Sequence, residues 1–165
     1  MIDQYIRQYG KRLYGLCMTL CANRDDADDL YQDTWIKVVK NIDSYDTSKE
    51  FEPWLTRICV NTYRNGLRRL MKSPIFNGFA NDDEKQAVIE NVKSPEATDY
   101  SYLHEAIDKL PEKLRVTVIL FYFKDMDVAA TSATLGIPEG TVKSRLNKAR
   151  KLLKEVLDND TDIRF

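Results

Sequence analysis

Apolar residues recur at steps of three and four along most of this 165-residue chain. The first run contains Tyr5, Ile6, Tyr9, Leu13, Leu16, Cys17 and Leu20. Such spacing places the whole run on one face of an α-helix, because the helix turns once in about 3.6 residues. Only the stretch 75–98 lacks a sustained period, and it contains Gly78 and the pair Ser94-Pro95. The pattern predicts an all-α protein with two small helical domains joined by a flexible linker.

The same periodicity predicts where the helices lie. We expect helices over residues 5–20, 25–40 and 53–70 in the first domain, and over 100–109, 111–124, 127–135 and 141–157 in the second. Pro53 suits the first position of its helix, since that position has no hydrogen-bonded N–H to lose. We place the domains at 1–72 and 100–157, an acidic linker at 73–99 and a polar tail at 158–165.

Composition argues against several functional classes. The chain has no run of about 18 apolar residues, so we expect no membrane span, and its first residues do not resemble a secretory signal. The three cysteines and the single His104 show no zinc-ligand spacing, and Cys17 and Cys21 fit the apolar face of the first helix. Neither a Ser/His/Asp set nor a glycine-rich phosphate loop is recognisable. We therefore expect a cytoplasmic, reduced protein that is not an enzyme and uses no cofactor, metal or small-molecule substrate.

Charge is distributed unevenly, although the formal net charge is only −1. Residues 57–72 hold five cations and no acid, and residues 141–154 hold six cations and no acid. Between them, residues 81–99 hold six acids against two lysines. Two basic stretches separated by an acidic one indicate two contacts with a polyanion.

The second basic stretch divides on a helical wheel. The apolar side holds Val142, Leu146, Ala149, Leu152, Leu153, Val156 and Leu157. Upstream, Gly136 and Gly140 predict a tight turn and Asp127 predicts the cap of a short helix, which together form a helix-turn-helix layout. The second helix of such a unit enters the major groove of DNA. The residues predicted to contact DNA are Lys143, Ser144, Arg145, Asn147 and Lys148. The alternative is a solvated charged face.

The first basic stretch carries a second stripe. Arg57, Asn61, Arg64 and Arg68 fall within about 60° on the wheel. The far side holds Trp54, Leu55, Ile58, Cys59, Thr62 and Leu70, which we expect to pack inward. Arginines on either side of one asparagine are typical of a phosphate grip around a base-reading amide. The preceding loop carries Tyr45, Phe51 and Trp54, aromatic residues that either stack on unpaired bases or belong to the core.

The helix predicted at 25–40 points to a protein partner instead. Its main apolar face holds Ala27, Leu30, Tyr31, Thr34, Trp35, Val38 and Ile42. Ile36 and Val39 lie off that face, beside Asp29, Gln32 and Asp33. An apolar pair surrounded by acids repels DNA and fits a protein with a basic surface. The alternative is that the acids only complement the dipole at the start of the helix.

Three stretches together resemble the extracytoplasmic-function group of bacterial sigma factors. "ADDLYQDTWIKV" is similar to that family's core-polymerase-binding stretch and "FEPWLTRICVNTYRNGLRR" to its −10-element helix. "LPEKLRVTVILFYF…LGIPEGTVKSRLNKARKLL" is similar to its −35-element domain. The resemblance covers residues 1–72, as sigma region 2, and 100–157, as sigma region 4 with its helix-turn-helix.

The resemblance implies an alternative sigma factor that binds core RNA polymerase and directs promoter-specific initiation. It implies contact with the clamp helices of the largest subunit through Asp29, Gln32, Asp33, Trp35 and Ile36. It implies capture of a flipped −10 base by Asn61 and Tyr45, beside Arg57, Arg64 and Arg68, and reading of the −35 duplex by the residues of the helix-turn-helix. The flap of the second-largest subunit and an anti-sigma factor are the further partners implied.

Two positions depart from the family pattern. Thr131-Ser132 stands where the family usually has Ile-Ala. Asp125 stands where the family often has glycine, and aspartate tolerates left-handed backbone geometry better than most residues.

Two rival functions follow from parts of the pattern. A stand-alone helix-turn-helix regulator would bind DNA without core polymerase, but it leaves the Arg57–Arg68 stripe unexplained. An anti-sigma-like adaptor would act through protein contacts alone and would tolerate charge reversal at Lys143 and Arg145.

Overall fold

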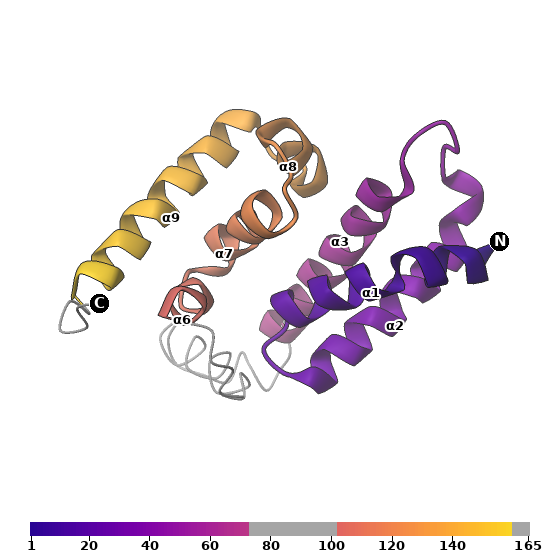
Figure 1. The fold of residues 1–165 in the computed structure, drawn as a ribbon, viewed down its shortest axis with the longest axis horizontal. Coiled ribbons are helices and arrows are strands. Elements are labelled where there is room, and N and C mark those ends of the chain that lie inside the picture. The colour runs from indigo at the N-terminus through magenta and orange to yellow at the C-terminus, as the bar shows by residue number, and fades with distance from the viewer. Residues whose placement is uncertain (73–101, 160–165) are drawn as a thin grey trace. The chain divides into compact units, whose positions relative to one another are not determined.

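The computed structural model describes residues 1–72 and 102–159, and within these ranges the regular elements are all helical (Figure 1). The chain divides into two compact units, Met1–Glu96 and Ala97–Phe165. The all-α, two-unit prediction is therefore confirmed. The predicted linker and most of the predicted tail lie outside the described residues.

Three helices form the first unit: α1 (Ile2–Leu20), α2 (Arg24–Asn41) and α3 (Phe51–Lys72), with a short 3₁₀ turn at Ile42–Ser44. They pack against one another pairwise (Figure 1). Asn23 starts α2, because its side-chain oxygen accepts a hydrogen bond from the Asp26 N–H at 2.8 Å. The core is built from the apolar stripes of all three helices and includes Leu13, Leu16, Leu20, Ala27, Leu30, Val38, Leu55 and Val60.

Two predictions about α3 are wrong in detail. The helix begins at Phe51, so Pro53 stands at its third position. The proline still costs no hydrogen bond, because the N–H groups of the first turn have no partner within the helix. Leu70 is 39% exposed instead of packing inward, since it lies in the last turns of α3 while Leu55, Cys59 and Val60 supply the packing.

A pair of thiols links α1 to α3 inside this core. Cys17 Sγ lies 3.8 Å from Cys59 Sγ, and neither residue is exposed. The hydrogen bond with Cys59 and burial both raise the pKa of the Cys17 thiol, because each disfavours the thiolate. The predicted core packing of Cys17 is confirmed, whereas Cys21 is only half-buried.

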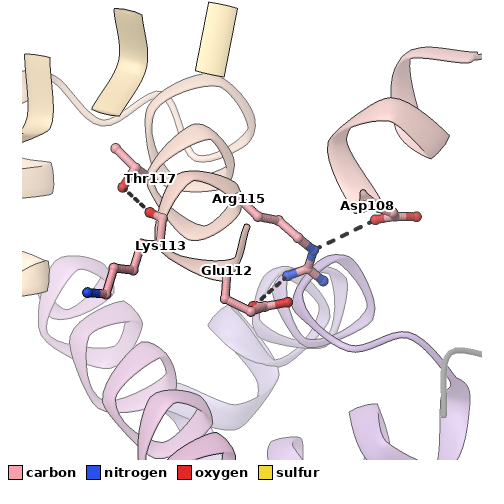
Figure 2. A network of polar contacts seen from close by, with 5 residues as sticks. All are labelled: Asp108, Glu112, Lys113, Arg115 and Thr117. Carbon is pink, nitrogen blue, oxygen red and sulfur yellow. Dashed lines mark hydrogen bonds and ion pairs between the residues drawn. The ribbon is translucent and has the colours of Figure 1, made fainter. Parts of the chain in front are cut away.

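The second unit contains α6 (Tyr102–Asp108), α7 (Glu112–Val118), α8 (Val128–Leu135) and α9 (Glu139–Asn159). Figure 2 shows Arg115 of α7 between two carboxylates: its Nε lies 3.8 Å from Asp108 Oδ1 and its Nη1 lies 3.6 Å from Glu112 Oε2. The pair with Asp108 joins α6 to α7, whereas the pair with Glu112 lies within the first turn of α7. The core of the unit comprises Ile107, Leu110, Leu114, Val118, Val142, Leu146 and Ala149.

The helix predicted over 111–124 is interrupted. After Val118 the chain forms a π-helical turn, η2 (Ile119–Phe123), which closes with the Lys124 N–H donating to the Ile119 carbonyl at 3.1 Å. In this turn Ile119 and Leu120 are buried, while Tyr122 and Phe123 are 49% and 41% exposed. A π turn widens the helix by one residue, so it changes the direction of the side chains that follow.

The turn between α8 and α9 is held by backbone hydrogen bonds and by the side chain of Ser132, a residue that departs from the family pattern. Gly136 has φ +66° and ends α8, and the N–H groups of Gly136 and Ile137 both donate to the Ser132 carbonyl, at 2.9 and 3.2 Å. The Ser132 hydroxyl also donates to the Ile137 carbonyl. Gly140 was expected in this turn, but it lies in the first turn of α9 because that helix already begins at Glu139.

The start of α8 agrees with expectation. Asp127 caps the helix by accepting a hydrogen bond from the Ala130 N–H at 2.7 Å. Two residues earlier, Asp125 has φ +51°, the left-handed geometry that glycine adopts most easily.

The first prediction concerns Thr131, which is fully buried in α8 while its hydroxyl has no hydrogen-bond partner among the described residues. Thr131→Val keeps the shape and removes the unpaired hydroxyl, so we expect the free energy of unfolding to rise by about 1 kcal/mol. Urea denaturation followed by circular dichroism measures this change.

The matched control is Thr117→Val. Thr117 is equally buried, but its hydroxyl donates to the Lys113 carbonyl at 2.7 Å (Figure 2), so the change should leave stability unchanged or lower it. A loss of stability in Thr131→Val would contradict the prediction.

Candidate DNA-binding and protein-binding surfaces

The predicted division of α9 is confirmed. Val142, Leu146 and Ala149 are at most 2% exposed and face the core of the second unit. The opposite side carries Lys143, Ser144, Asn147, Lys148, Lys151 and Lys154, which are all exposed. These six residues, together with half-buried Arg145 at the edge of the apolar side, are called here the α9 basic face. Lys143, Arg145 and Lys148 form no ion pair within the described residues, so their charges stay available to an anion.

Arg150 lies at the edge of this face and was not predicted as a site residue. Its Nε donates to the Tyr122 hydroxyl at 2.8 Å, and its guanidinium carbon lies 5.8 Å from the centre of the Tyr122 ring. Its Nη1 donates to Asn147 Oδ1 at 3.3 Å. The sequence shows Arg150 and Asn147 three residues apart on a helix, but it gives no sign of the contact with Tyr122.

On α3, the predicted stripe is at the surface. Arg57 and Arg68 are exposed, and Asn61 and Arg64 are half-buried. Behind them, Leu55, Thr56, Cys59 and Val60 are at most 2% exposed and fix the rotation of the helix. Three guanidinium groups therefore flank one amide on a single helical face, an arrangement suited to gripping phosphates around one base.

The loop before α3 contributes Tyr45 to a cluster of aromatic rings, whereas Phe51 and Trp54, which were expected in the loop, lie at the start of α3. The Tyr45 ring lies 5.0 Å from the Trp54 ring and 5.3 Å from the Phe51 ring, centre to centre, and Phe51 stacks on Tyr5 of α1 at 4.0 Å. The Tyr45 hydroxyl donates to the Lys49 carbonyl. Loss of contact with water raises the pKa of Tyr45, because it disfavours the charged phenolate. Tyr45 and Trp54 are half-buried, so the cluster belongs partly to the core and partly to the surface.

Asp46 gives the tip of this loop a fixed turn. Its Oδ1 accepts hydrogen bonds from the Ser48 hydroxyl at 2.6 Å and from the Ser48 N–H at 3.0 Å. These two bonds lower the pKa of the Asp46 carboxyl, because they favour its ionised form. The ionised carboxyl therefore stabilises the turn by accepting both hydrogen bonds from Ser48.

On α2, an apolar pair is open to solvent. Ile36 and Val39 are each 52% exposed, and Asp29, Gln32 and Asp33 beside them are exposed too. Ile36, Val39 and these three polar residues are called here the α2 patch. Trp35 was predicted to share this contact surface, but it is only 7% exposed, because its ring packs within the unit.

Within the parts of the chain that the structure describes, no group of three or more His, Cys, Asp or Glu residues is placed to hold a metal ion. The described helices include none with the length and apolar character needed to cross a membrane.

Comparison with known proteins identifies both units. Residues 5–73 match the family model of Sigma-70 region 2, and residues 100–153 match that of Sigma-70, region 4. The ECF RNA polymerase sigma factor EcfG of Rhodopseudomonas palustris is 30% identical over 149 residues, which make up 88% of this chain and 78% of that protein. The ECF RNA polymerase sigma factor SigE of Mycolicibacterium smegmatis is 32% identical over 160 residues, 94% of this chain but only 61% of that longer protein.

A solved structure shows the same fold. The sigma factor RpoE of Bartonella quintana, determined in complex with the anti-sigma factor NepR, matches with a TM-score of 0.72 and 23% identity. The match covers 96% of this chain and 97% of that chain. Two family models in this order, together with EcfG as a relative that is 30% identical over most of both chains, lead to one assignment: the chain belongs to the extracytoplasmic-function group of RNA polymerase sigma factors.

Proposed function

We propose that this protein is an alternative sigma factor that binds core RNA polymerase and directs it to promoters with a particular pair of −10 and −35 elements. The observation that carries the proposal is the presence of a cationic helical face on each unit, on α3 and on α9, together with an exposed apolar pair on α2. The protein itself catalyses nothing in this scheme and acts in the cytoplasm, where the polymerase works.

The α2 patch is the proposed contact with core polymerase. The exposed side chains of Ile36 and Val39 supply apolar surface, and Asp29, Gln32 and Asp33 supply charge and hydrogen-bond acceptors for the basic side of a helical partner. The clamp helices of the largest subunit are the proposed partner. The buried Trp35 supports this surface from beneath, since it fixes the rotation of α2.

The face of α3 is the proposed contact with the −10 element. Arg57, Arg64 and Arg68 would hold phosphates on both sides of a base that Asn61 recognises, with the loop around Tyr45 forming a wall beside it. Only an unpaired base can enter such a site, so binding favours the open form of the promoter over the closed duplex. This difference in affinity drives strand separation without any chemical step.

The α9 basic face is the proposed reader of the −35 duplex. Ser144 and Asn147 are short polar residues that reach base edges, while Lys143, Arg145 and Lys148 reach guanine acceptors or phosphates. We also propose that the second unit docks on the flap of the second-largest subunit, and that an anti-sigma factor covers the polymerase-binding surfaces. The complex of the related fold with NepR supports the latter.

Transcription in vitro tests the proposal. Purified protein and core polymerase, incubated with a library of promoter sequences, should produce transcripts that core polymerase alone does not start. A gel shift separates the rival regulator, because a sigma factor needs core polymerase for tight promoter binding and a stand-alone regulator does not. Absence of any transcript dependent on this protein would refute the proposal.

The second prediction concerns the α2 patch. Ile36→Ser and Val39→Ser each remove apolar surface that is half-exposed in the free protein, so each should weaken binding to core polymerase by about 1 kcal/mol, roughly fivefold. Titration of a fluorescently labelled protein with core polymerase measures the affinity. Met18→Ser is the matched control, because Met18 of α1 is 40% exposed and belongs to no proposed surface. Equal losses in all three variants would show that the α2 patch has no special part in binding.

A further inference from the structure

A hydrogen-bonded chain links the π-helical turn to the α9 basic face. Tyr122 of η2 accepts a bond from Arg150 Nε at 2.8 Å, and Arg150 Nη1 donates to Asn147 Oδ1 at 3.3 Å. All three side chains are exposed, so they share one surface of the second unit. The π turn brings Tyr122 to this place, since it ends with the Lys124 N–H bonded to the Ile119 carbonyl five residues back.

The chemistry of arginine decides which way the Asn147 amide faces. A guanidinium group has only donors, so it can be paired only with the amide oxygen of Asn147 and never with its NH₂ group. The NH₂ group, with two hydrogens to donate, therefore remains for DNA. The ring of Tyr122 lies against the guanidinium as well and restricts the movement of Arg150.

This arrangement has a consequence for base recognition. An asparagine that reads adenine uses both ends of its amide: the oxygen accepts from the adenine N6 amino group while the NH₂ donates to N7. Here the Arg150 guanidinium already donates to one of the two lone pairs of the oxygen, and its positive charge disfavours the approach of a further donor group. Guanine, with its O6 and N7, and thymine, with its O4, present only acceptors in the major groove, whereas adenine presents its N6 donor beside N7.

We propose that Arg150 is a positioning residue that, held by Tyr122, orients Asn147 to recognise guanine or thymine and to reject adenine in the −35 element. The inference rests on the proposed function, because it assumes that the α9 basic face lies in the major groove. It adds two residues, Arg150 and Tyr122, that determine specificity without needing to touch a base.

The test uses holoenzyme assembled from the full chain and core polymerase, and a promoter library randomised across the −35 element. Sequencing of the bound DNA gives the base preference at each position, and the position read by Asn147 is the one whose preference disappears in Asn147→Ala. There the unaltered protein should favour guanine or thymine over adenine by about tenfold. Arg150→Met should raise adenine to the level of guanine, and Tyr122→Phe, which removes only the hydroxyl, should shift the ratio in the same direction by a smaller factor.

Lys154→Met is the control for loss of one positive charge on α9, and it should weaken binding to all sequences without changing the ratio. Circular dichroism confirms that the variants are folded. An unchanged ratio in both Arg150→Met and Tyr122→Phe, an adenine preference in the unaltered protein, or no position sensitive to Asn147→Ala would each overturn the inference while a selected −35 sequence keeps the proposed function. Failure to select any −35 sequence would overturn both.

Discussion

The substitution Asn61→Ala is expected to leave holoenzyme assembly intact and to reduce promoter opening by about ten- to a hundredfold. Asn61 is half-buried on α3, in line with Arg57 and Arg64, and its amide is the one neutral group of that face able both to donate to a base and to accept from it. Loss of such a contact costs about 1–3 kcal/mol. Because only the unpaired base makes this contact, the loss falls on the open complex and leaves the closed complex unaffected.

Permanganate reactivity of unpaired thymines near the start site measures this effect, with core binding measured separately on the same protein. Asn65→Ala is the matched control: Asn65 is an exposed asparagine one helical turn after Asn61, at the border of the stripe, and it shows whether loss of any amide from this surface has the same effect. Footprints of Asn61→Ala equal to those of the unaltered protein would remove Asn61 from the −10 site. Weaker core binding would instead assign it to the polymerase contact.

Removal of cations from the α9 basic face is expected to have the second large effect. Lys143→Ala, Arg145→Ala and Lys148→Ala should each weaken binding to the −35 element by about 1–3 kcal/mol where the side chain contacts a base. A residue that contacts a phosphate should instead weaken binding to all sequences and lower the dependence on salt by about one ion. The kind of loss, and not only its size, therefore distinguishes a residue that contacts a base from one that contacts a phosphate.

Holoenzyme affinity for promoter DNA, measured at several salt concentrations with a matched and a scrambled −35 element, separates the two kinds of contact. Lys109→Ala serves as the control, because Lys109 is an exposed lysine of the same unit placed between α6 and α7. Unchanged affinity in all three α9 variants would return this face to the rival interpretation, a solvated charged surface.

The helical faces could be predicted from the sequence, because the period of about 3.6 residues determines which side chains share a face. Val142 and Leu146 are buried while Lys143 and Asn147 are exposed, as the wheel requires. The exposure of Ile36 follows in the same way, since it lies off the main apolar face of α2. Here the local pattern and the packing agree, and the surface follows directly.

Contacts between residues far apart in the sequence could not be predicted in this way. Tyr122, which contacts Arg150, lies in the π turn that follows α7, and no spacing of apolar residues signals a helix that widens by one residue. Leu70 shows the opposite error, because the wheel assigns a side but does not say where the neighbouring helices end. The roles of Thr131 and Ser132 also depend on contacts that the sequence does not show. The Ser132 hydroxyl stabilises the turn after α8, whereas the Thr131 hydroxyl has no hydrogen-bond partner among the described residues.

The thiol pair in the first unit has a practical consequence for the experiments above. Alkylating reagents such as maleimides attack the thiolate, and Cys17 is both inaccessible and held in its neutral form by its raised pKa. Cys59 is equally inaccessible, which leaves half-buried Cys21, just after α1, as the cysteine most open to modification. A single fluorophore attached there, with no engineered cysteine, would provide a ready-made reporter for titrations with core polymerase.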